Sequence, residues 1–167
     1  MKKQKNLKIM AIVLIFITLM LVLVGCGNSS NTTTLTAEEI INKMKEKNTN
    51  IGKVVVYTEE TDLNQLLGRP GQYISKISFE DKRLEQENAD NEYLTEEERN
   101  EPTGGTIEVF ENEKDMKKRK EYIEGFSTSS MFSQYVYSKG NVLLRVDGDL
   151  TPTQAKEYES LLNEIIK

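Results

Sequence analysis

The chain has 167 residues, with 22 basic and 27 acidic side chains and a formal net charge of −5. It contains no histidine and a single cysteine, which excludes catalysis or metal binding by histidine and also excludes an internal disulfide. Because an acidic surface is repelled by phosphates, we expect no nucleic-acid partner.

The first 25 residues have the layout of an export signal. Their positively charged start contains Lys2, Lys3, Lys5 and Lys8. An uncharged apolar run follows over residues 9–24. This run is shorter than the roughly 20 residues that a membrane-spanning helix needs, so we predict a signal peptide over residues 1–25.

The sequence Leu23-Val24-Gly25-Cys26 resembles the lipobox of bacterial lipoprotein signals. This resemblance implies cleavage before Cys26 and attachment of a diacylglyceryl group to its thiol. Two acyl chains hold a protein stably at a membrane, because each buried methylene contributes about 0.8 kcal/mol. We therefore expect a lipoprotein anchored on the extracytoplasmic face of the cell membrane. The alternatives are a transmembrane helix, a secreted protein with a free thiol, and a cysteine buried in the core.

A polar segment separates the cysteine from the rest of the chain. Residues 28–34 read Asn-Ser-Ser-Asn-Thr-Thr-Thr, and we predict a lipidated cysteine with a flexible tether over residues 26–35. Cleavage would remove four of the 22 basic residues and no acidic ones, leaving a net charge of −9 that anionic lipid headgroups repel. Residues 36–167 suffice for one domain with its own apolar core.

The first half of this domain predicts a helix and two strands. Thr36 and Glu39 form a capping box before a helix over 37–47, and β-branched residues predict a strand over 53–58. A second strand is predicted over 73–79. The side chains expected on one face of this strand are Tyr73, Ser75, Ile77 and Phe79.

A short helical turn is predicted between these strands. Asp62 is a suitable N-cap, Gly68 can adopt the left-handed conformation that ends a helix, and Pro70 prevents its continuation. Alternate oxygen ligands at Asp62 and Asn64 suggest a calcium loop, but Gln65 stands where such a loop requires glycine. We therefore predict no metal site here.

An acidic loop is predicted over residues 80–104. It contains ten acidic and three basic residues between Glu80 and Glu101, and few large apolar residues. Thr95 could cap one helical turn within it, and the run Glu96-Glu97-Glu98 could bind a divalent cation weakly. We expect the loop to be solvated.

The second half predicts a strand, a helix, a hairpin and a final helix. The strand covers 105–110, Asn112 caps a helix to residue 124, and two strands over 132–138 and 141–147 flank a turn at Gly140. The last helix begins with a capping box and an N1 proline, at Thr151, Pro152 and Gln154. Its apolar stripe contains Ala155, Tyr158, Leu162 and Ile165.

This order of elements predicts an α+β domain over 36–167. Strands joined by short turns favour an antiparallel sheet, here of about five strands, with the helices packed on one face.

Two resemblances concern the domain itself. The turn Gln65-Leu66-Leu67-Gly68-Arg69-Pro70 resembles the Leu-Gly-x-Pro turn of domains like the β-lactamase inhibitory protein and outer-membrane assembly lipoproteins. More broadly, residues 36–79 and 105–167 resemble small Gram-positive bacterial membrane lipoproteins of uncharacterised function. The first resemblance implies a protein-binding scaffold, and neither transfers a functional residue to this chain.

The sequence contains no recognisable catalytic set, metal site or cofactor motif, so we lean against an enzyme. Our leading hypothesis is a lipid-anchored, non-enzymatic binding module for a protein or cell-envelope component. Capture of a small ligand or cation by the acidic loop is the first alternative, and a carboxylate-dependent envelope hydrolase is the second. The lipid attachment site is Cys26.

Two further segments are candidate contact surfaces. The predicted helix carries a basic face, formed by Lys114, Lys117, Lys118, Arg119 and Lys120. This face could dock an acidic partner, cell-wall phosphates or the protein's own acidic loop. Alternatively, this face is an ordinary solvated surface with acidic residues interspersed. The aromatic-rich segment 126–137 could form a recognition edge, although packing in the core is the favoured interpretation.

Overall fold

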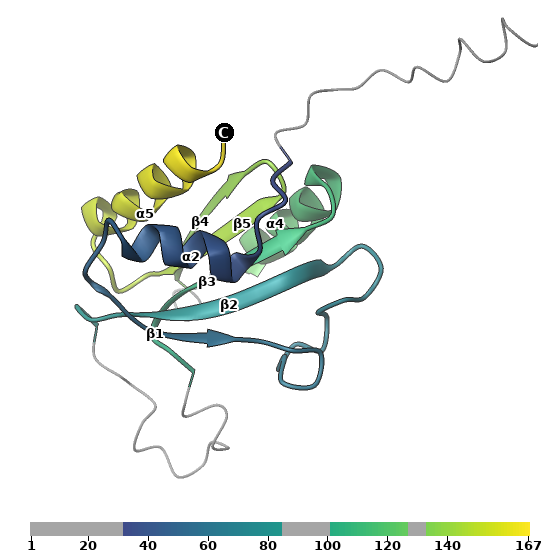
Figure 1. Ribbon diagram of the computed structural model, residues 1–167, viewed down its shortest axis with the longest axis horizontal. Coiled ribbons are helices and arrows are strands. Elements are labelled where there is room, and N and C mark those ends of the chain that lie inside the picture. Colours follow the sequence, from purple (N-terminus) through teal and green to yellow (C-terminus); the bar gives the residue numbers. More distant parts are fainter. Residues whose placement is uncertain (1–31, 85–100, 127–132) are drawn as a thin grey trace, which may run out of the picture. The chain divides into compact units, whose positions relative to one another are not determined.

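Five strands form one antiparallel sheet in the described part of the chain, in the order β1-β2-β3-β5-β4 (Figure 1). The computed structural model describes residues 32–84, 101–126 and 133–167. The strands are β1 (Ile51–Val56), β2 (Tyr73–Asp81), β3 (Gly104–Phe110), β4 (Gln134–Lys139) and β5 (Val142–Asp147). The helices of the same residues are α2 (Ala37–Lys45), α4 (Glu113–Phe126) and α5 (Pro152–Ile165). The predicted α+β fold with an antiparallel sheet is confirmed.

Both predicted capping boxes are present. The Thr36 hydroxyl accepts a hydrogen bond from the Glu39 amide at 3.2 Å, and the Glu39 carboxylate accepts one from the Thr36 amide at 2.8 Å. Thr151 and Gln154 make the same exchange, at 3.3 and 2.8 Å, at the start of α5. Each box satisfies amides that the first helical turn leaves unpaired, so local sequence fixes where these helices begin.

Helices α2 and α5 pack on one face of the sheet and form the main core (Figure 1). Ile77 and Phe79 of β2 and Tyr158 of α5 are fully buried there, with the Phe79 and Tyr158 rings 5.2 Å apart. Complete burial of such a side chain contributes roughly 1.5–3 kcal/mol. The Ser75 hydroxyl also accepts a hydrogen bond from the Ala37 amide at 3.0 Å, which ties the start of α2 to β2.

Helix α4 lies on the opposite face, so helices cover both sides of the sheet rather than the one side expected. Met116 and Ile123 of α4 pack with Phe110 and Leu143 in a second core. Leu143 and Leu144 are neighbours on β5, yet they enter different cores, because successive side chains of a strand point to opposite faces. A strand with consecutive apolar residues needs cover on both sides, and α4 provides the second cover.

A β-bulge corrects the prediction for β2. Tyr73 pairs with Phe110, but the next paired residue, Ser75, is opposite Val109, so β2 has one extra residue at this point. The bulge turns Tyr73 into the second core, whereas Ile77 stays in the main core. The expectation that Tyr73 shares a face with Ser75 and Ile77 is therefore wrong.

Residues 62–67 form turns rather than the predicted helical turn. The Asp62 carboxylate does accept backbone amides as a cap would, from Leu66 at 2.9 Å and Leu67 at 3.0 Å. Gly68 has a φ of 76°, as the prediction of a left-handed residue requires. Its amide donates to the Tyr73 carbonyl at 2.9 Å, which closes the loop onto the start of β2.

The acidic loop begins later than expected. Glu80 belongs to β2 and pairs with Gly104 of β3, so both ends of the predicted segment 80–104 are parts of strands. Asp81 is fully buried and accepts hydrogen bonds from the Tyr158 hydroxyl at 2.6 Å and the Arg83 guanidinium at 2.7 Å. Residues 85–100, which include the predicted turn at Thr95 and the run Glu96–Glu98, lie outside the described residues.

We predict that Gly68→Ala lowers the free energy of unfolding by about 1 kcal/mol. A side chain is strained at a φ of 76°, and the new Cβ would also lie 2.5 Å from a Glu59 carboxylate oxygen. Urea denaturation measures the change.

The matched control is Gly125→Ala on α4, where a Cβ meets nothing within 4 Å. Alanine is the better helix former, so this control should raise stability by roughly 0.5–1 kcal/mol. Equal effects of the two substitutions would contradict the backbone argument.

Candidate functional site

The sheet face opposite α2 and α5 is polar beyond the area that α4 covers. The cross-strand pairs Ser78 with Thr106, and Thr106 with Arg145, place these three side chains on that face. We define the polar face by six residues on three neighbouring strands, namely Lys76, Ser78, Thr106, Glu108, Arg145 and Asp147.

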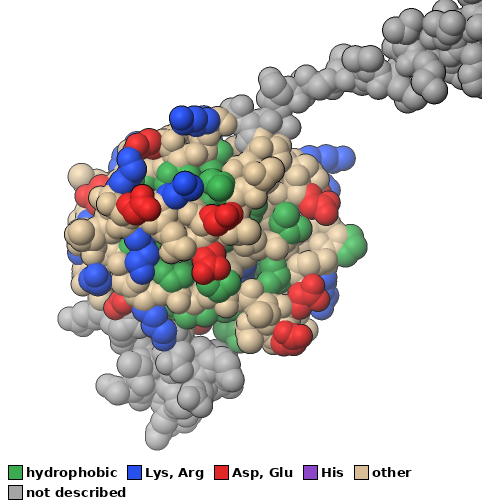
Figure 2. Space-filling model, viewed as in Figure 1, with side chains coloured by type: hydrophobic (Ala, Val, Ile, Leu, Met, Phe, Trp, Pro, Cys, Tyr) green, Lys and Arg blue, Asp and Glu red, His purple; other side chains and the backbone are tan. Residues whose placement is uncertain are grey.

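The other side of the domain has a different character. In Figure 2, which looks onto α2 and α5, basic and acidic side chains are interspersed and no large area has one sign. Two ion pairs lie on this side: Lys47 with Glu164, both exposed, and the exposed Lys156 with the partly buried Glu159. Such pairs contribute at most about 1 kcal/mol each, which is typical of a solvated surface.

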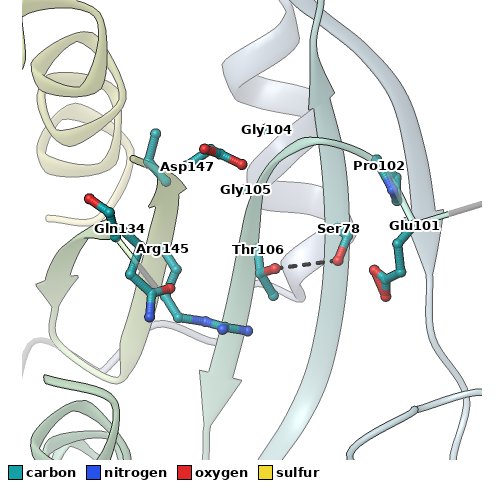
Figure 3. Close-up of a pocket in the computed structure, with 11 residues that line it drawn as sticks. Ser78, Glu101, Pro102, Gly104, Gly105, Thr106, Gln134, Arg145 and Asp147 are labelled. Atoms are coloured by element: carbon teal, nitrogen blue, oxygen red, sulfur yellow. Dashed lines mark hydrogen bonds between the residues drawn. The ribbon is translucent and has the colours of Figure 1, made fainter. Parts of the chain in front are cut away.

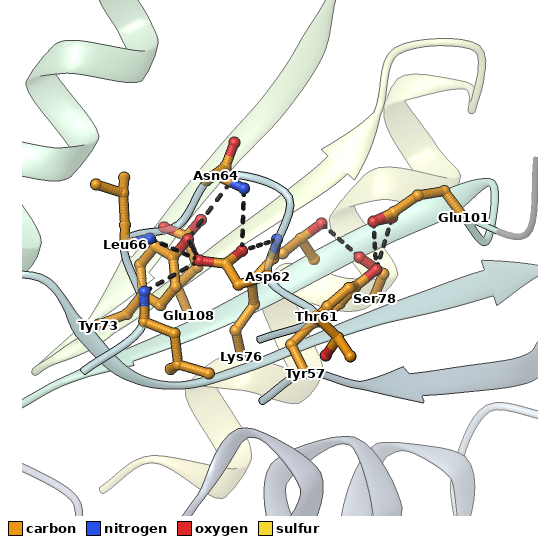
Figure 4. Close-up of polar contacts among 12 residues, drawn as sticks. Tyr57, Thr61, Asp62, Asn64, Leu66, Tyr73, Lys76, Ser78, Glu101 and Glu108 are labelled. Atoms are coloured by element: carbon orange, nitrogen blue, oxygen red, sulfur yellow. Dashed lines mark hydrogen bonds and ion pairs between the residues drawn. The ribbon is translucent and has the colours of Figure 1, made fainter. Parts of the chain in front are cut away.

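A buried ion pair occupies one end of the polar face (Figure 4). The Lys76 ammonium lies 2.8 Å from the Asp62 carboxylate, and both side chains are almost completely buried. The Tyr73 hydroxyl donates to the same carboxylate at 2.6 Å, and the Lys76 ammonium lies 4.2 Å from the centre of the Tyr57 ring. These contacts of Asp62 with Lys76 and Tyr73 hold the loop that precedes β2 against that strand.

This environment lowers the pKa of Asp62 and raises the pKa of Tyr73. Burial alone would raise the pKa of Asp62, but hydrogen bonds from Lys76, Tyr73 and two backbone amides outweigh it, and the pKa lies well below its ordinary 3.8. Burial, together with the hydrogen bond to Asp62, raises the pKa of Tyr73. Asp62 therefore remains charged and Tyr73 remains protonated at neutral pH.

A second buried carboxylate, Glu108, lies at the centre of the polar face. It accepts hydrogen bonds from Arg119 of α4 at 3.1 and 3.2 Å, and from Arg145 of β5 at 3.1 Å. Burial would lower the pKa of Arg119, but its hydrogen bonds with Glu108 outweigh this and raise it. Two guanidinium groups share one carboxylate, so the cluster carries one surplus positive charge.

Arg145 is the incompletely paired member of this cluster. Its Nε atom is buried and has no hydrogen-bond partner among the described residues, whereas the side chain as a whole is 21% exposed. A buried donor without a partner costs about 1–3 kcal/mol, so such a group calls for a water molecule or ligand near it.

A further contact joins Tyr57, which follows β1, to Glu101, which precedes β3. The Tyr57 hydroxyl lies within hydrogen-bond distance of both Glu101 carboxylate oxygens, the longer contact being 2.7 Å (Figure 4). Burial, and then this hydrogen bond, raises the pKa of Tyr57. The phenol therefore acts as a hydrogen-bond donor at neutral pH and not as a base.

A pocket of about 280 Å³ opens on the polar face at the end of the sheet that holds Gly104 and Asp147 (Figure 3). Hydroxyl, amide, carboxylate and guanidinium groups line it. Ser78 and Thr106 lie 3.3 Å apart between Arg145 and Glu101. The other lining residues are Pro102, Gly104, Gly105, Ser133, Gln134, Val146 and Asp147.

The basic face predicted over Lys114–Lys120 is divided by the structure. Arg119 points inward to Glu108, whereas Lys117 pairs with Glu113 at 2.7 Å and Lys118 pairs with Asp115 at 2.7 Å. Most of its basic side chains therefore form ion pairs with acidic residues of the same domain. This agrees with the alternative that the face is an ordinary solvated surface.

The aromatic-rich segment 126–137 is divided as well. Tyr135 and Tyr137 pack against the main core, as expected. Phe126 is exposed and contacts the Tyr122 ring, with the ring centres 4.9 Å apart. Residues 127–132 lie outside the described residues, as does Cys26 with the signal peptide.

Sequence reasoning did not identify the polar face. The sequence does contain one indication of it: polar residues stand two positions apart within otherwise apolar strands, as Lys76 and Ser78 do, and Arg145 and Asp147. That signal shows which residues share a face of one strand. It does not show that β3 pairs with β5, which is what assembles the pocket.

Within residues 32–84, 101–126 and 133–167, no three acidic or cysteine side chains are grouped so as to hold a metal ion. None of the helices described there is long and apolar enough to cross a membrane. Comparisons with family models, curated proteins and solved structures found no match to this chain.

We predict that Asp62→Asn destabilises the domain by about 3 kcal/mol at pH 7, because it leaves the buried Lys76 ammonium without its counter-charge. The pKa of Asp62 is lowered by folding, so its stabilisation is complete above pH 3.8 and is lost as the pH falls further. The difference from wild type should therefore shrink between pH 4 and pH 2. Urea denaturation across this pH range measures it.

Glu46→Gln is the control, since Glu46 is exposed. Its effect should stay within about 0.5 kcal/mol. A pH-independent difference between Asp62→Asn and wild type would contradict the assignment.

Proposed function

We propose that this protein is a lipid-anchored extracytoplasmic lipoprotein whose α+β domain binds a protein or cell-envelope component without catalysing a reaction. Cys26 is the proposed lipid attachment site and the membrane is its first partner. The polar face with its pocket is the proposed contact surface. The observation that carries the proposal is that Thr33, where the tether joins the domain, and the pocket lie at opposite ends of the same strands.

The tether joins the domain at a defined point. The Asn141 side chain is buried, its Oδ1 atom accepts the Thr33 amide at 2.8 Å, and its Nδ2 atom donates to the Thr33 carbonyl at 3.1 Å. The same Nδ2 atom also donates to the carbonyl of Phe110, the last residue of β3. We call this arrangement the Asn141 clip.

The pocket lies at the other end of these strands. Strand β3 begins with Gly104 in the pocket and ends with Phe110 at the clip, a span of roughly 20 Å at about 3.3 Å per residue. The seven-residue span from Cys26 to Thr33 reaches at most about 25 Å. A tether of this length would keep the domain close to the membrane, and it joins the domain at the end of β3 opposite the pocket.

The chemistry of the polar face favours binding over catalysis. The carboxylates of Asp62 and Glu108 are held by buried cations, and Tyr57 and Tyr73 are kept protonated. All four groups are held by hydrogen bonds, and Asp62, Tyr57 and Tyr73 do not change charge near neutral pH. Fixed donors and acceptors suit recognition of a polar partner.

We expect wild-type protein to incorporate radiolabelled fatty acid in cells and to have Cys26 as its mature N-terminus by mass spectrometry. Cys26→Ala should incorporate none, because no thiol is left to acylate. Ser29→Ala is the matched control and should behave as wild type. Absence of label from the wild-type protein would refute the lipid anchor.

The position of the pocket predicts where a partner is contacted in intact cells. Lys82 follows β2 at the pocket end, and Lys139 lies at the end of β4 beside the clip. Amine-reactive cross-linking followed by mass spectrometry should capture an envelope partner through Lys82 more often than through Lys139. Partner links through Lys139 alone would place the binding surface at the clip end of the sheet and contradict the proposal.

A further inference from the structure

The pocket on the polar face contains groups of both charges at separate positions (Figure 3). Arg145 lies on one side, where its guanidinium reaches across toward Thr106. Asp147 is two residues further along β5, on the same face and about 7 Å away along the strand. Glu101 lies beyond Ser78, across β3 and β2. The pocket thus offers one cation and two carboxylates.

Arg145 is suited to receive an anionic group. A guanidinium has five N–H donors, and Glu108 accepts one hydrogen bond from it, at Nη2. Its Nε donor has no partner in the part of the domain that the structure describes. Because Glu108 is shared with Arg119, it does not neutralise both arginines. A carboxylate is the group that matches the planar donor geometry of arginine.

A ligand with only a negative charge is not complementary to the rest of the pocket, which contains two carboxylates. Asp147 and Glu101 would repel it, and their oxygens would instead attract an ammonium group. Asp147 uses one carboxylate oxygen to accept the Asp149 amide at 2.9 Å, which holds its side chain in place. The hydroxyls of Ser78 and Thr106 lie between the charged groups and can hydrogen-bond a polar ligand.

We infer that this pocket binds a small zwitterion of the amino-acid or dipeptide class, with its carboxylate on Arg145 and its ammonium on Asp147 or Glu101. A volume of about 280 Å³ is at the lower end for ligand pockets and suits a molecule of this size. The inference rests on the proposed binding function and specifies one ligand class for it.

Isothermal titration calorimetry of the full chain in detergent tests the inference. The probes are the free amino acids and alanyl-alanine, with propionate and ethylamine as single-charge controls. At least one zwitterion should bind, and both controls should bind at least about tenfold more weakly.

Two variants test which residue binds the carboxylate of the ligand and which binds its ammonium group. Arg145→Gln and Asp147→Asn should each weaken the binding of that zwitterion by about tenfold or more. Asp147→Asn leaves the Glu108 cluster intact, so it remains informative if Arg145→Gln fails to fold. Lys156→Gln, an exposed position on α5, should leave binding unchanged.

Failure of every zwitterion to bind folded wild-type protein would overturn the inference. Propionate binding as tightly as the best zwitterion, or unchanged binding to Asp147→Asn, would also overturn it. These results leave the lipid anchor and the cross-linking result standing, because neither depends on a small ligand. Failure of fatty-acid labelling, in turn, would remove the anchor without affecting the calorimetry.

Discussion

The buried carboxylate of Glu108 is the interaction on which the described arrangement depends. It lies on the central strand of the sheet and is held by one guanidinium from α4 and one from β5. Burying a charge is costly unless it is paired and hydrogen-bonded, so Glu108 fixes the position of both arginines. It thereby holds α4 against the sheet and leaves Arg145 at the edge of the pocket. The packing of α4 on this face and the position of Arg145 in the neighbouring pocket therefore both depend on Glu108.

The bulge in β2 has a related role. By turning Tyr73 into the second core, it brings the tyrosine hydroxyl to Asp62, and Asp62 in turn pairs with Lys76. One extra residue therefore couples the loop before β2 to the polar face. Two ion clusters, around Asp62 and Glu108, order this side of the sheet. The other side is mainly apolar, and its one buried carboxylate among the described residues, Asp81, is held by Arg83 and Tyr158.

The local features of the fold were predictable from sequence, and the site was not. The capping boxes at Thr36 and Thr151 depend on residues three positions apart, and the left-handed Gly68 depends on one turn. The pairing of β3 with β5 brings together residues about 40 positions apart, and no periodicity encodes it. The bulge at Ser75 shifts a register that alternation alone predicts incorrectly. The strands and caps could therefore be located, whereas the groups around Glu108 and Arg145 became neighbours only in the folded sheet.

The Asn141 clip also has a mechanical consequence. If the proposed anchor holds the protein at a membrane, tension along the tether would reach the domain around Thr33, where the buried Asn141 side chain makes two hydrogen bonds. Asn141 passes this load to the end of β3 through Phe110, and not directly to the start of α2. If the clip opened, the next point of attachment would be Leu35, which packs against the main core, and the tether would lengthen by about 7 Å while the sheet remained intact. The clip thus sets how far the domain can stand from its anchor.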